Sequence, residues 1–358
     1  MDERIFSYKK GKPIPDWDIL HRLPTDKPVG PECRDTGTIF RVNSTWMDVT
    51  DQPFRSKHMT GAGVFVCLFG VIYCVILLFV VFSRRNDGMD EWFYIFQLFL
   101  FCGLGCFLYF AFKGGRDEFF SLKRRPIRFN RREQKIYTIR RRRFFGNSGD
   151  GDVTWEIPWN SQSIFCIHKN PKSADKVYHI RHYTVDDAGN VLRAFSIGRQ
   201  WDQNDMQSVL SQWNYWCEYM NQGPAHLPSP PLYFSEEESI RESFLFCTYN
   251  IGFAGVSLAY ILFLPILVGE TIIRRIALAT SRCHIWPKSV QSVSAVDLGD
   301  AYDQPRGETP IGWAATGTAR GYNQWPLDPK CDSANWHGEK DAVKNAELWK
   351  QDIPRIFA

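Results

Sequence analysis

The 358-residue sequence has none of the short motifs that identify common enzyme and metal-binding classes. It lacks a P-loop, a GxGxxG turn, HExxH, GxSxG and any CxxC pair. The ten cysteines have no paired spacing, so neither a disulfide framework nor a secreted domain is expected. His179 and His182 lie three residues apart on one expected strand and therefore point to opposite faces. Missing motifs lower the prior for an enzyme without excluding one. We expect a non-enzymatic protein with no cofactor and no metal site.

We also expect no cleavable signal peptide at the start of the sequence, because the first apolar run comes too late. Residues 1–60 are polar, with five prolines between positions 13 and 31, and we expect an N-terminal cytoplasmic arm. A strand-like piece over 38–42, followed by NSTWM at 43–47, interrupts this arm. It docks on the later domain in one interpretation and belongs to a flexible arm in the other.

Long apolar runs are what the sequence does have. Residues 61–82 carry no charge, and Gln97 is the only strongly polar side chain in 92–112. At about 1.5 Å per residue, each run covers a hydrocarbon core of about 30 Å. We therefore expect a two-helix transmembrane hairpin over 61–112. A notch of small residues at 102–106 favours packing within the hairpin over a dimer face, although a homo-oligomer through these helices stays open.

Basic residues dominate after the hairpin, with thirteen Lys and Arg against three acidic residues between positions 113 and 143. This bias places the flanks of the hairpin on the cytoplasmic side. Topology alone explains the run most simply; an acidic protein partner and an anionic lipid are the alternatives. Nucleic acid is the weakest candidate, because no aromatic platform accompanies the charges. The candidate partner- or lipid-binding residues are Lys123, Arg124, Arg125, Arg128, Arg131, Arg132, Arg140, Arg141, Arg142 and Arg143.

Residues 113–222 are expected to form a basic, β-rich cytoplasmic domain. Period-2 patterns separated by turn residues predict strands over 125–130, 134–140, 153–159, 164–169, 177–183 and 191–198. An apolar stripe at offsets of three and four then predicts an amphipathic helix over 206–220. The pattern indicates an α+β fold with an antiparallel β roll, pleckstrin-homology-like, closed by a C-terminal amphipathic helix. An unrelated α+β sandwich is the alternative, because strand order does not fix topology.

The rest of the chain is a Pro-rich linker and helix start at 223–242, a third apolar segment at 243–270, and a Trp-rich region at 271–358. A third crossing would export the basic residues that follow it, and Asn250 and Pro265 interrupt the apolar run. A re-entrant membrane hairpin is therefore favoured over a third span or a buried soluble helix. The Trp-rich region is expected to pack on the β domain.

Several of these pieces together resemble a functionally unassigned family of bacterial inner-membrane proteins that are often encoded beside type VI secretion effectors. They are NSTWM at 43–47, the apolar hairpin, RPIRFNRREQKIY at 125–137, EIPW at 156–159 and IRRIALATSRCHIWP at 273–287. The resemblance covers about 38–303 and implies a multi-pass inner-membrane protein that serves as immunity or accessory protein for a toxin. It implies no catalytic residue, and the tail after Asp303 departs from the pattern.

The leading hypothesis is thus a non-enzymatic inner-membrane protein whose cytoplasmic domain binds a protein partner, a toxin or a secretion component. The first alternative is a membrane-surface sensor that binds anionic lipid through the basic β-hairpin. The second is an enzyme that acts on membrane substrates through an unfamiliar site.

Overall fold

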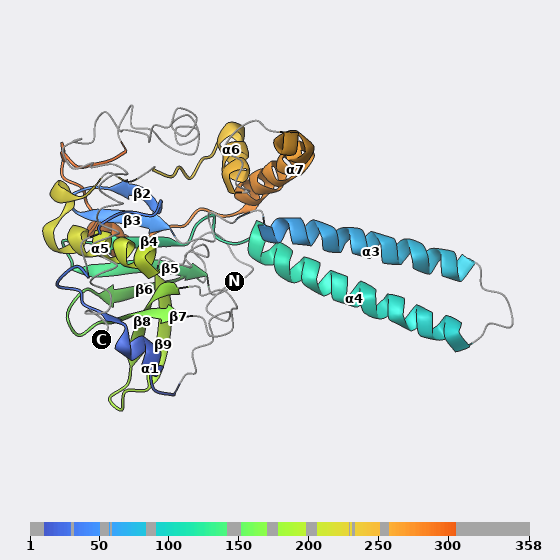
Figure 1. Cartoon of the computed structure of the whole chain (residues 1–358), viewed down its shortest axis with the longest axis horizontal. Coiled ribbons are helices and arrows are strands. Elements are labelled where there is room, and N and C mark those ends of the chain that lie inside the picture. The colour runs from blue at the N-terminus through green and yellow to red at the C-terminus, as the bar shows by residue number, and fades with distance from the viewer. Residues whose placement is uncertain are drawn as a thin grey trace.

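The computed structural model describes residues 11–305 except 30–31, 51–56, 58, 84–90, 142–151, 170–177, 198–205, 229, 231–232 and 251–257. Within that part of the chain it shows an α+β body from which two long apolar helices project (Figure 1). Residues 306–358, most of the Trp-rich region predicted to pack on the β domain, lie outside the described residues.

Two antiparallel sheets form the body. The five-stranded sheet has the order β2-β3-β4-β5-β6, and the four-stranded sheet has the order β1-β7-β8-β9. The strands of the first are β2 (Ile39–Val42), β3 (Trp46–Thr50), β4 (Pro126–Asn130), β5 (Lys135–Arg141) and β6 (Asp152–Pro158). Those of the second are β1 (Arg22–Leu23), β7 (Ile164–Lys169), β8 (Tyr178–Val185) and β9 (Val191–Ile197). The six strands predicted after the hairpin are confirmed as β4 to β9.

The N-terminal arm supplies two strands to the five-stranded sheet, which decides between the two interpretations of residues 38–47. β2 and β3 pair with each other, and β3 pairs along its whole length with β4, so residues 38–47 dock on the later domain. The apolar helices are inserted between β3 and β4, two strands that are neighbours in the sheet. The short helix α1 (Asp16–Leu20) lies against β7, whose edge pairs with β1.

Helix α5 (Met206–Gln222) closes the body and confirms the predicted amphipathic helix. Trp213 and Trp216 of α5 are fully buried, and their rings contact Trp159, Phe165 and Phe129 at centroid distances of 5.0–5.1 Å. Each large aromatic side chain removes about 150–250 Å² from water. The aromatic cluster therefore joins α5 and the two sheets into one core.

The two apolar helices, α3 (Met59–Ser83) and α4 (Glu91–Phe119), run antiparallel side by side (Figure 1). Thr60–Ser83 and Trp92–Arg116 are long and apolar enough to cross a membrane. The helices approach each other closely at Gly70, which faces Phe107, and at Gly114, which faces Val64. The predicted notch at 102–106 contributes only Gly103, which faces Cys74, because Cys102 and Cys106 are exposed.

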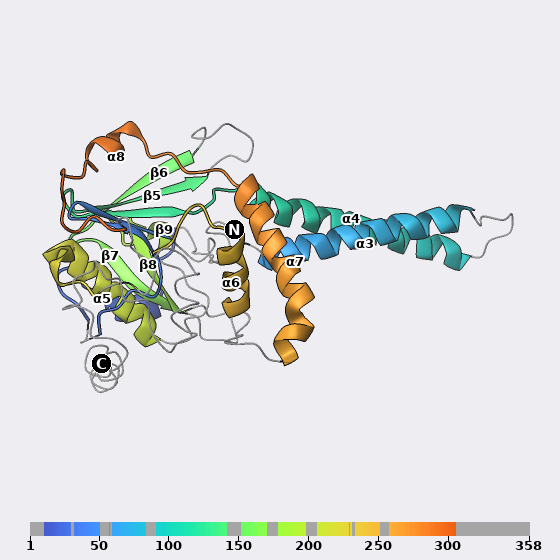
Figure 2. The same cartoon turned by 90° about the horizontal axis from the view of Figure 1, so that it is seen from above.

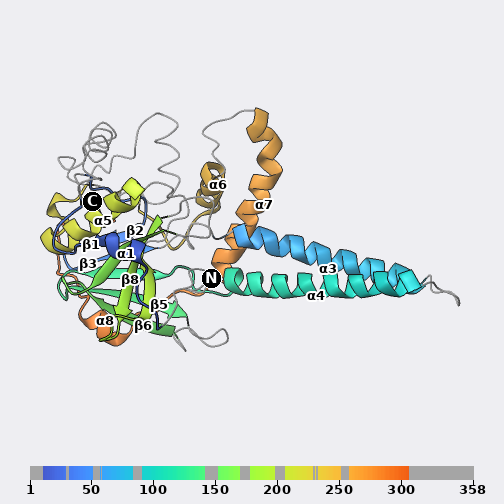
Figure 3. The ribbon, with the colours of Figure 1, turned by 60° about the horizontal axis from the view of Figure 1, so that its bottom comes forward.

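The third apolar segment forms two helices, α6 (Ile240–Asn250) and α7 (Leu258–Thr280). Figures 2 and 3 show α6 between the β body and α7, and α7 lying across the base of the α3–α4 pair. A 3-10 turn η1 (Pro224–His226) follows α5, and the short helix α8 (Lys288–Ser292) follows α7.

Candidate functional site: a buried arginine network

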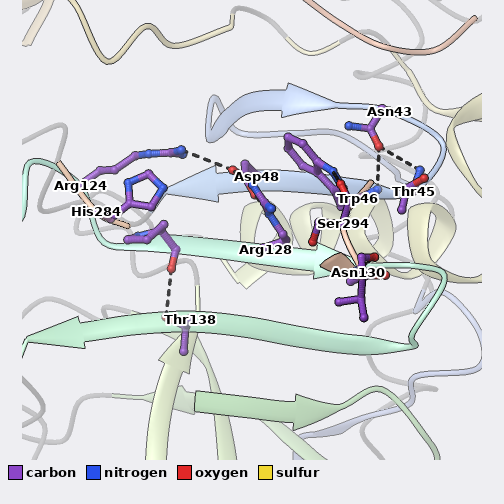
Figure 4. A network of polar contacts seen from close by, with 12 residues as sticks. Asn43, Thr45, Trp46, Asp48, Arg124, Arg128, Asn130, Thr138, His284 and Ser294 are labelled. Carbon is purple, nitrogen blue, oxygen red and sulfur yellow. Dashed lines mark hydrogen bonds and ion pairs between the residues drawn. The ribbon is translucent and has the colours of Figure 1, made fainter. Parts of the chain in front are cut away.

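The most concentrated group of buried charges lies where β3 and β4 pair. The register places Asp48 directly opposite Arg128, and both side chains are buried. Arg128 donates two parallel hydrogen bonds to the Asp48 carboxylate, from Nε at 2.7 Å and from Nη2 at 2.8 Å (Figure 4). Arg124 adds a longer contact of 3.4 Å to the same carboxylate. Two parallel hydrogen bonds of this kind neutralise the carboxylate and also fix the orientation of the guanidinium.

Two tryptophan rings enclose the Arg128 guanidinium. Its central carbon lies 3.9 Å from the centroid of Trp46 and 4.8 Å from that of Trp286. Trp46 comes from β3, whereas Trp286 comes from residues 282–294, which we name the C-terminal strap. A cation over an aromatic face is attracted by the ring quadrupole, and the attraction strengthens in a desolvated setting. The arginine thus attaches the strap to the sheet.

Hydrogen bonds at the other end of β3 hold the strap in the same way. Trp46 Nε1 donates to the carbonyl of Ser294 at 2.8 Å, and Asn130 Nδ2 donates to the carbonyl of Val293 at 3.0 Å. The β2–β3 turn is closed by Asn43, whose Oδ1 accepts from the backbone N–H groups of Thr45 and Trp46. The strap is therefore held by the cation–π contact of Trp286 and by hydrogen bonds to its backbone carbonyls.

The electrostatics of the network favour the charged form of Asp48. Burial raises the pKa of this carboxyl, but the hydrogen bonds and charge of Arg128, with the charge of Arg124, outweigh burial and hold the pKa below its ordinary value. Arg124 also pairs with Glu236 at 2.7 Å and lies over the Phe40 ring. Burial, together with Arg124, lowers the pKa of His284 to about 4, so this histidine is neutral at pH 7.

This arrangement suits a structural role better than proton transfer. The carboxylate of Asp48 accepts from two arginines, and each guanidinium is occupied by a carboxylate and by aromatic faces. A general acid or base must reach a substrate proton with a pKa near the working pH, and Asp48 meets neither condition. In the described ranges no three or more His, Cys, Asp or Glu side chains are grouped so as to hold a metal ion.

A second polar cluster lies on the outer face of the four-stranded sheet, beneath α1. Asp18 accepts from the Tyr183 hydroxyl at 2.5 Å and contacts His168 Nδ1 at 2.7 Å, while Arg181 Nη1 donates to the same hydroxyl at 3.2 Å. Burial lowers the pKa of His168 despite the neighbouring carboxylate, so the ring is neutral at pH 7. Sequence reasoning missed this cluster, because Asp18 belongs to an arm with no predicted structure at that point.

The histidine prediction is confirmed. The ring of His182 faces the core, 4.9 Å from the centroid of Phe165, and the ring of His179 lies on the opposite face beside His168. The two rings therefore do not point toward a common site.

The structure divides the ten predicted binding residues. Arg124 and Arg128 are buried and used inside the protein, so they do not present a surface to a partner or a lipid. Lys123, Arg125 and Arg131 are half-buried, and Arg132 is exposed and pairs with Asp297 at 3.2 Å. The side chains of Arg140, Arg141, Arg142 and Arg143 lie outside the described residues.

The register also separates the two ends of the basic run. β4 begins just after α4 and runs away from it, so residues 123–125 lie at the end of the body nearest the hairpin (Figure 1). The β4–β5 turn with Arg131 and Arg132 lies at the opposite end, and β5 returns toward the hairpin. Among the described side chains, the basic run therefore forms two separate groups rather than one basic face.

Three of the sequence pieces noted above meet in the arginine network. Residues 43–47 supply the turn and Trp46, residues 125–137 supply Arg128 and Asn130, and residues 273–287 supply His284 and Trp286. Their shared role is to bind the strap to the five-stranded sheet.

Comparison with known proteins gives a family match. A family model described as a family of unknown function (DUF6708) matches residues 104–297, which is more than half of the chain. No curated protein matches, and no solved structure matches. The matched range contains the end of α4, strands β4 to β9, helices α5 to α8 and the strap.

Proposed function

We propose that this chain, which belongs to the DUF6708 family of unknown function, is a non-enzymatic membrane protein whose β body binds a protein partner. The partner is a toxin or a secretion component, and the chain acts as an immunity or accessory protein of a type VI secretion toxin. The hairpin crosses the bacterial inner membrane, and the body lies on the cytoplasmic side.

The projecting hairpin carries the membrane part of the proposal. Along α3 and α4 large apolar side chains point outward, among them Phe79 at 71% and Phe99 at 70% exposure. Burying such a side chain is worth about 1.5–3 kcal/mol, so a helix pair with many of them needs an apolar medium around it. Backbone polar groups within both helices are satisfied internally, as a bilayer requires.

The basic residues support the cytoplasmic side. Lys123 and Arg125 lie between the end of α4 and the start of β4, close to the base of the hairpin. Positive charges beside a membrane helix favour the cytoplasmic face.

The fold of the body supports a binding role. Two antiparallel sheets share the aromatic core with α5, and we include a pleckstrin-homology-like roll in the proposal on that basis. The buried charges that come closest to a catalytic constellation are used to fasten the strap and α1. The resemblance to proteins encoded beside type VI effectors supports a toxin or secretion component as partner.

A competition assay tests the proposal. A sensitive sibling strain expresses the full chain and meets an attacker that delivers the effector encoded next to this gene. We expect protection, and we expect the effector or a secretion component to co-purify from detergent. Arg132→Glu reverses an exposed charge of the predicted site, and Lys135→Glu is its control, because Lys135 is a similarly accessible member of a surface ion pair outside that site. Absence of both protection and co-purification contradicts the proposal.

A second function, recognition of anionic lipid, is favoured by the position of Lys123 and Arg125 near the hairpin. A polybasic segment gains about 1 kcal/mol per Lys or Arg near an anionic surface. The test needs the full chain, because a fragment that starts at residue 123 lacks β1, β2 and β3. Nanodiscs with and without phosphatidylglycerol separate the two cases: Lys123→Gln with Arg125→Gln changes lipid enrichment only if lipid recognition is real.

A further inference from the structure

We infer that α7 lies flat in the membrane surface, with its outer face inserted at the boundary between headgroups and acyl chains. The occupant of this face is lipid. The inference rests on the proposed crossing of the membrane by α3 and α4, and it adds a second, differently oriented contact with the same bilayer.

The two faces of α7 differ in burial and in polarity. Leu267, Thr271, Arg274 and Leu278 recur at offsets of three and four and are all buried. The opposite face carries large exposed apolar side chains: Ile261, Leu262, Val268, Ile272 and Ile276, with exposures of 39–70%. Arg275 lies on this side as well, but it is half-buried and donates back to the carbonyl of Glu238. A helical stripe of this width is normally covered.

The buried face fixes α7 to the body. Arg274 is fully buried and bonds Glu238 through Nε at 2.8 Å and through Nη2 at 2.5 Å, and its guanidinium lies 4.0 Å from the Phe246 ring centroid of α6. A charge in such a place is tolerated only with a well-placed partner. The rotation of α7 about its own axis is therefore set by protein contacts, and the apolar stripe faces away from α6.

The orientation of α7 relative to the hairpin points to the membrane surface. Figures 2 and 3 show α7 running across the direction of α3 and α4, at the end of the hairpin that joins the body. α6 separates α7 from the β body, so the opposite face of α7 looks in the direction in which the hairpin projects. If the hairpin crosses a bilayer, this direction is toward the lipid.

A tight contact holds the crossing point. A Cβ atom built on Gly61, near the start of α3, would lie 2.4 Å from Ile273 of α7 and 3.3 Å from Phe119 of α4. The three helices thus meet at the level where the membrane candidate helices begin and end.

The connections at both ends of the α6–α7 segment agree with a segment that begins and ends on the same side of the membrane. Arg282, two residues after α7, exchanges backbone hydrogen bonds with Ser121 and Lys123, which directly follow α4. The other end of the segment is tied to the body, because α6 packs with Phe40 and Phe234 in one cluster. Helices in the interface typically insert their apolar face about 5–10 Å deep. This depth fits a helix that lies at the end of the hairpin nearest the body.

Photo-crosslinking of the full chain in nanodiscs tests the inference. Benzoylphenylalanine replaces Leu262, Ile272 or Ile276 on the stripe, Phe79 on the hairpin, or Tyr302 on the body, and mass spectrometry identifies the adducts. We expect lipid adducts at the three stripe positions and at Phe79, and none above background at the exposed Tyr302.

The outcomes separate this inference from the proposed function. Lipid adducts at Phe79 without any at the stripe overturn the inference and leave the membrane anchor intact. Adducts to protein at the stripe also overturn it, because the occupant is then a partner or a second copy. Absence of lipid adducts at Phe79 as well as at the stripe overturns the membrane anchor itself.

Discussion

Replacing Asp48 by Asn is the most direct perturbation of the arginine network. Asp48 is the shared carboxylate of Arg128 and Arg124, and all three side chains are buried. The asparagine keeps the shape but leaves Arg128 without its counter-charge. Removal of one partner from a buried ion pair typically costs about 3–5 kcal/mol. At about 2–4 °C per kcal/mol for a body of this size, the melting temperature falls by roughly 10 °C.

The assay is thermal unfolding of the full chain in detergent, followed by near-ultraviolet circular dichroism, which reports the packing of the aromatic side chains, Trp46 and Trp286 among them. Asp297→Asn is the matched control, because it breaks the exposed pair with Arg132, and such pairs contribute about 0–1 kcal/mol. If the melting temperature of Asp48→Asn falls no further than that of Asp297→Asn, Asp48 is not the counter-charge on which the buried network depends.

The pH dependence of the same variant provides a second test. The pKa of Asp48 is lowered in the folded protein, so its contribution is complete above the ordinary pKa of about 3.9 and is lost as the pH falls toward the folded value. The stability difference between the native chain and Asp48→Asn should therefore be full at pH 7 and should narrow below about pH 4.

Three further predictions concern stability. Gly61→Ala should destabilise the helix junction by about 1–3 kcal/mol because its methyl group overlaps α7, whereas Gly63→Ala, with open space around it, should be neutral or slightly stabilising in thermal unfolding. Arg274→Met leaves the Glu238 carboxylate buried and unpaired, which should cost about 3–5 kcal/mol and raise hydrogen exchange in α6 and α7. Burial, with the nearby Arg193, lowers the pKa of His182 to about 4. Because the unfolded chain takes up this proton first, the free energy of unfolding should fall by about 3 kcal/mol as the pH falls from 6.5 toward 4, and His182→Gln should flatten the stability profile in that window.

Exposed counterparts provide the controls for the last two. Arg41→Met removes a surface ion pair with Asp303 and should change the exchange of α6 and α7 little. His226→Gln alters an exposed histidine and should leave the pH profile between 4 and 6.5 as it is in the native chain. Equal effects of control and test variant would contradict the burial argument in either case.

Local patterns predicted the elements whose residues pack in a regular period. β4 to β9 and α5 follow from alternation, turn residues and a 3.6-residue stripe, because each element buries one face in the core. The two long apolar helices follow from composition alone. β1 and α1 escaped notice because they are short and have no period, and they exist only through pairing with β7, which is distant in sequence.

The candidate site was harder to predict for a physical reason. In the sequence alone a basic run indicates a charged surface, but Arg124 and Arg128 pair with a carboxylate on β3, which precedes the hairpin in the sequence. Neither that pairing nor the tryptophan from the strap has a local signal. The same holds for α7, whose buried Arg274 is explained only by Glu238 on another segment.

The sidedness of the full chain in the proposed inner membrane is the measurement that bears most directly on the proposed topology. Paired cytoplasm-active and periplasm-active reporters are fused after Ala358 and, in a second chain, inserted between positions 84 and 90. If α3 and α4 cross and α7 does not, as we propose, the reporter after Ala358 is cytoplasmic and the reporter at 84–90 is periplasmic. A periplasmic reporter after Ala358 contradicts this topology, because α7 would then be a third crossing and the strap would lie on the wrong side of the membrane from β4.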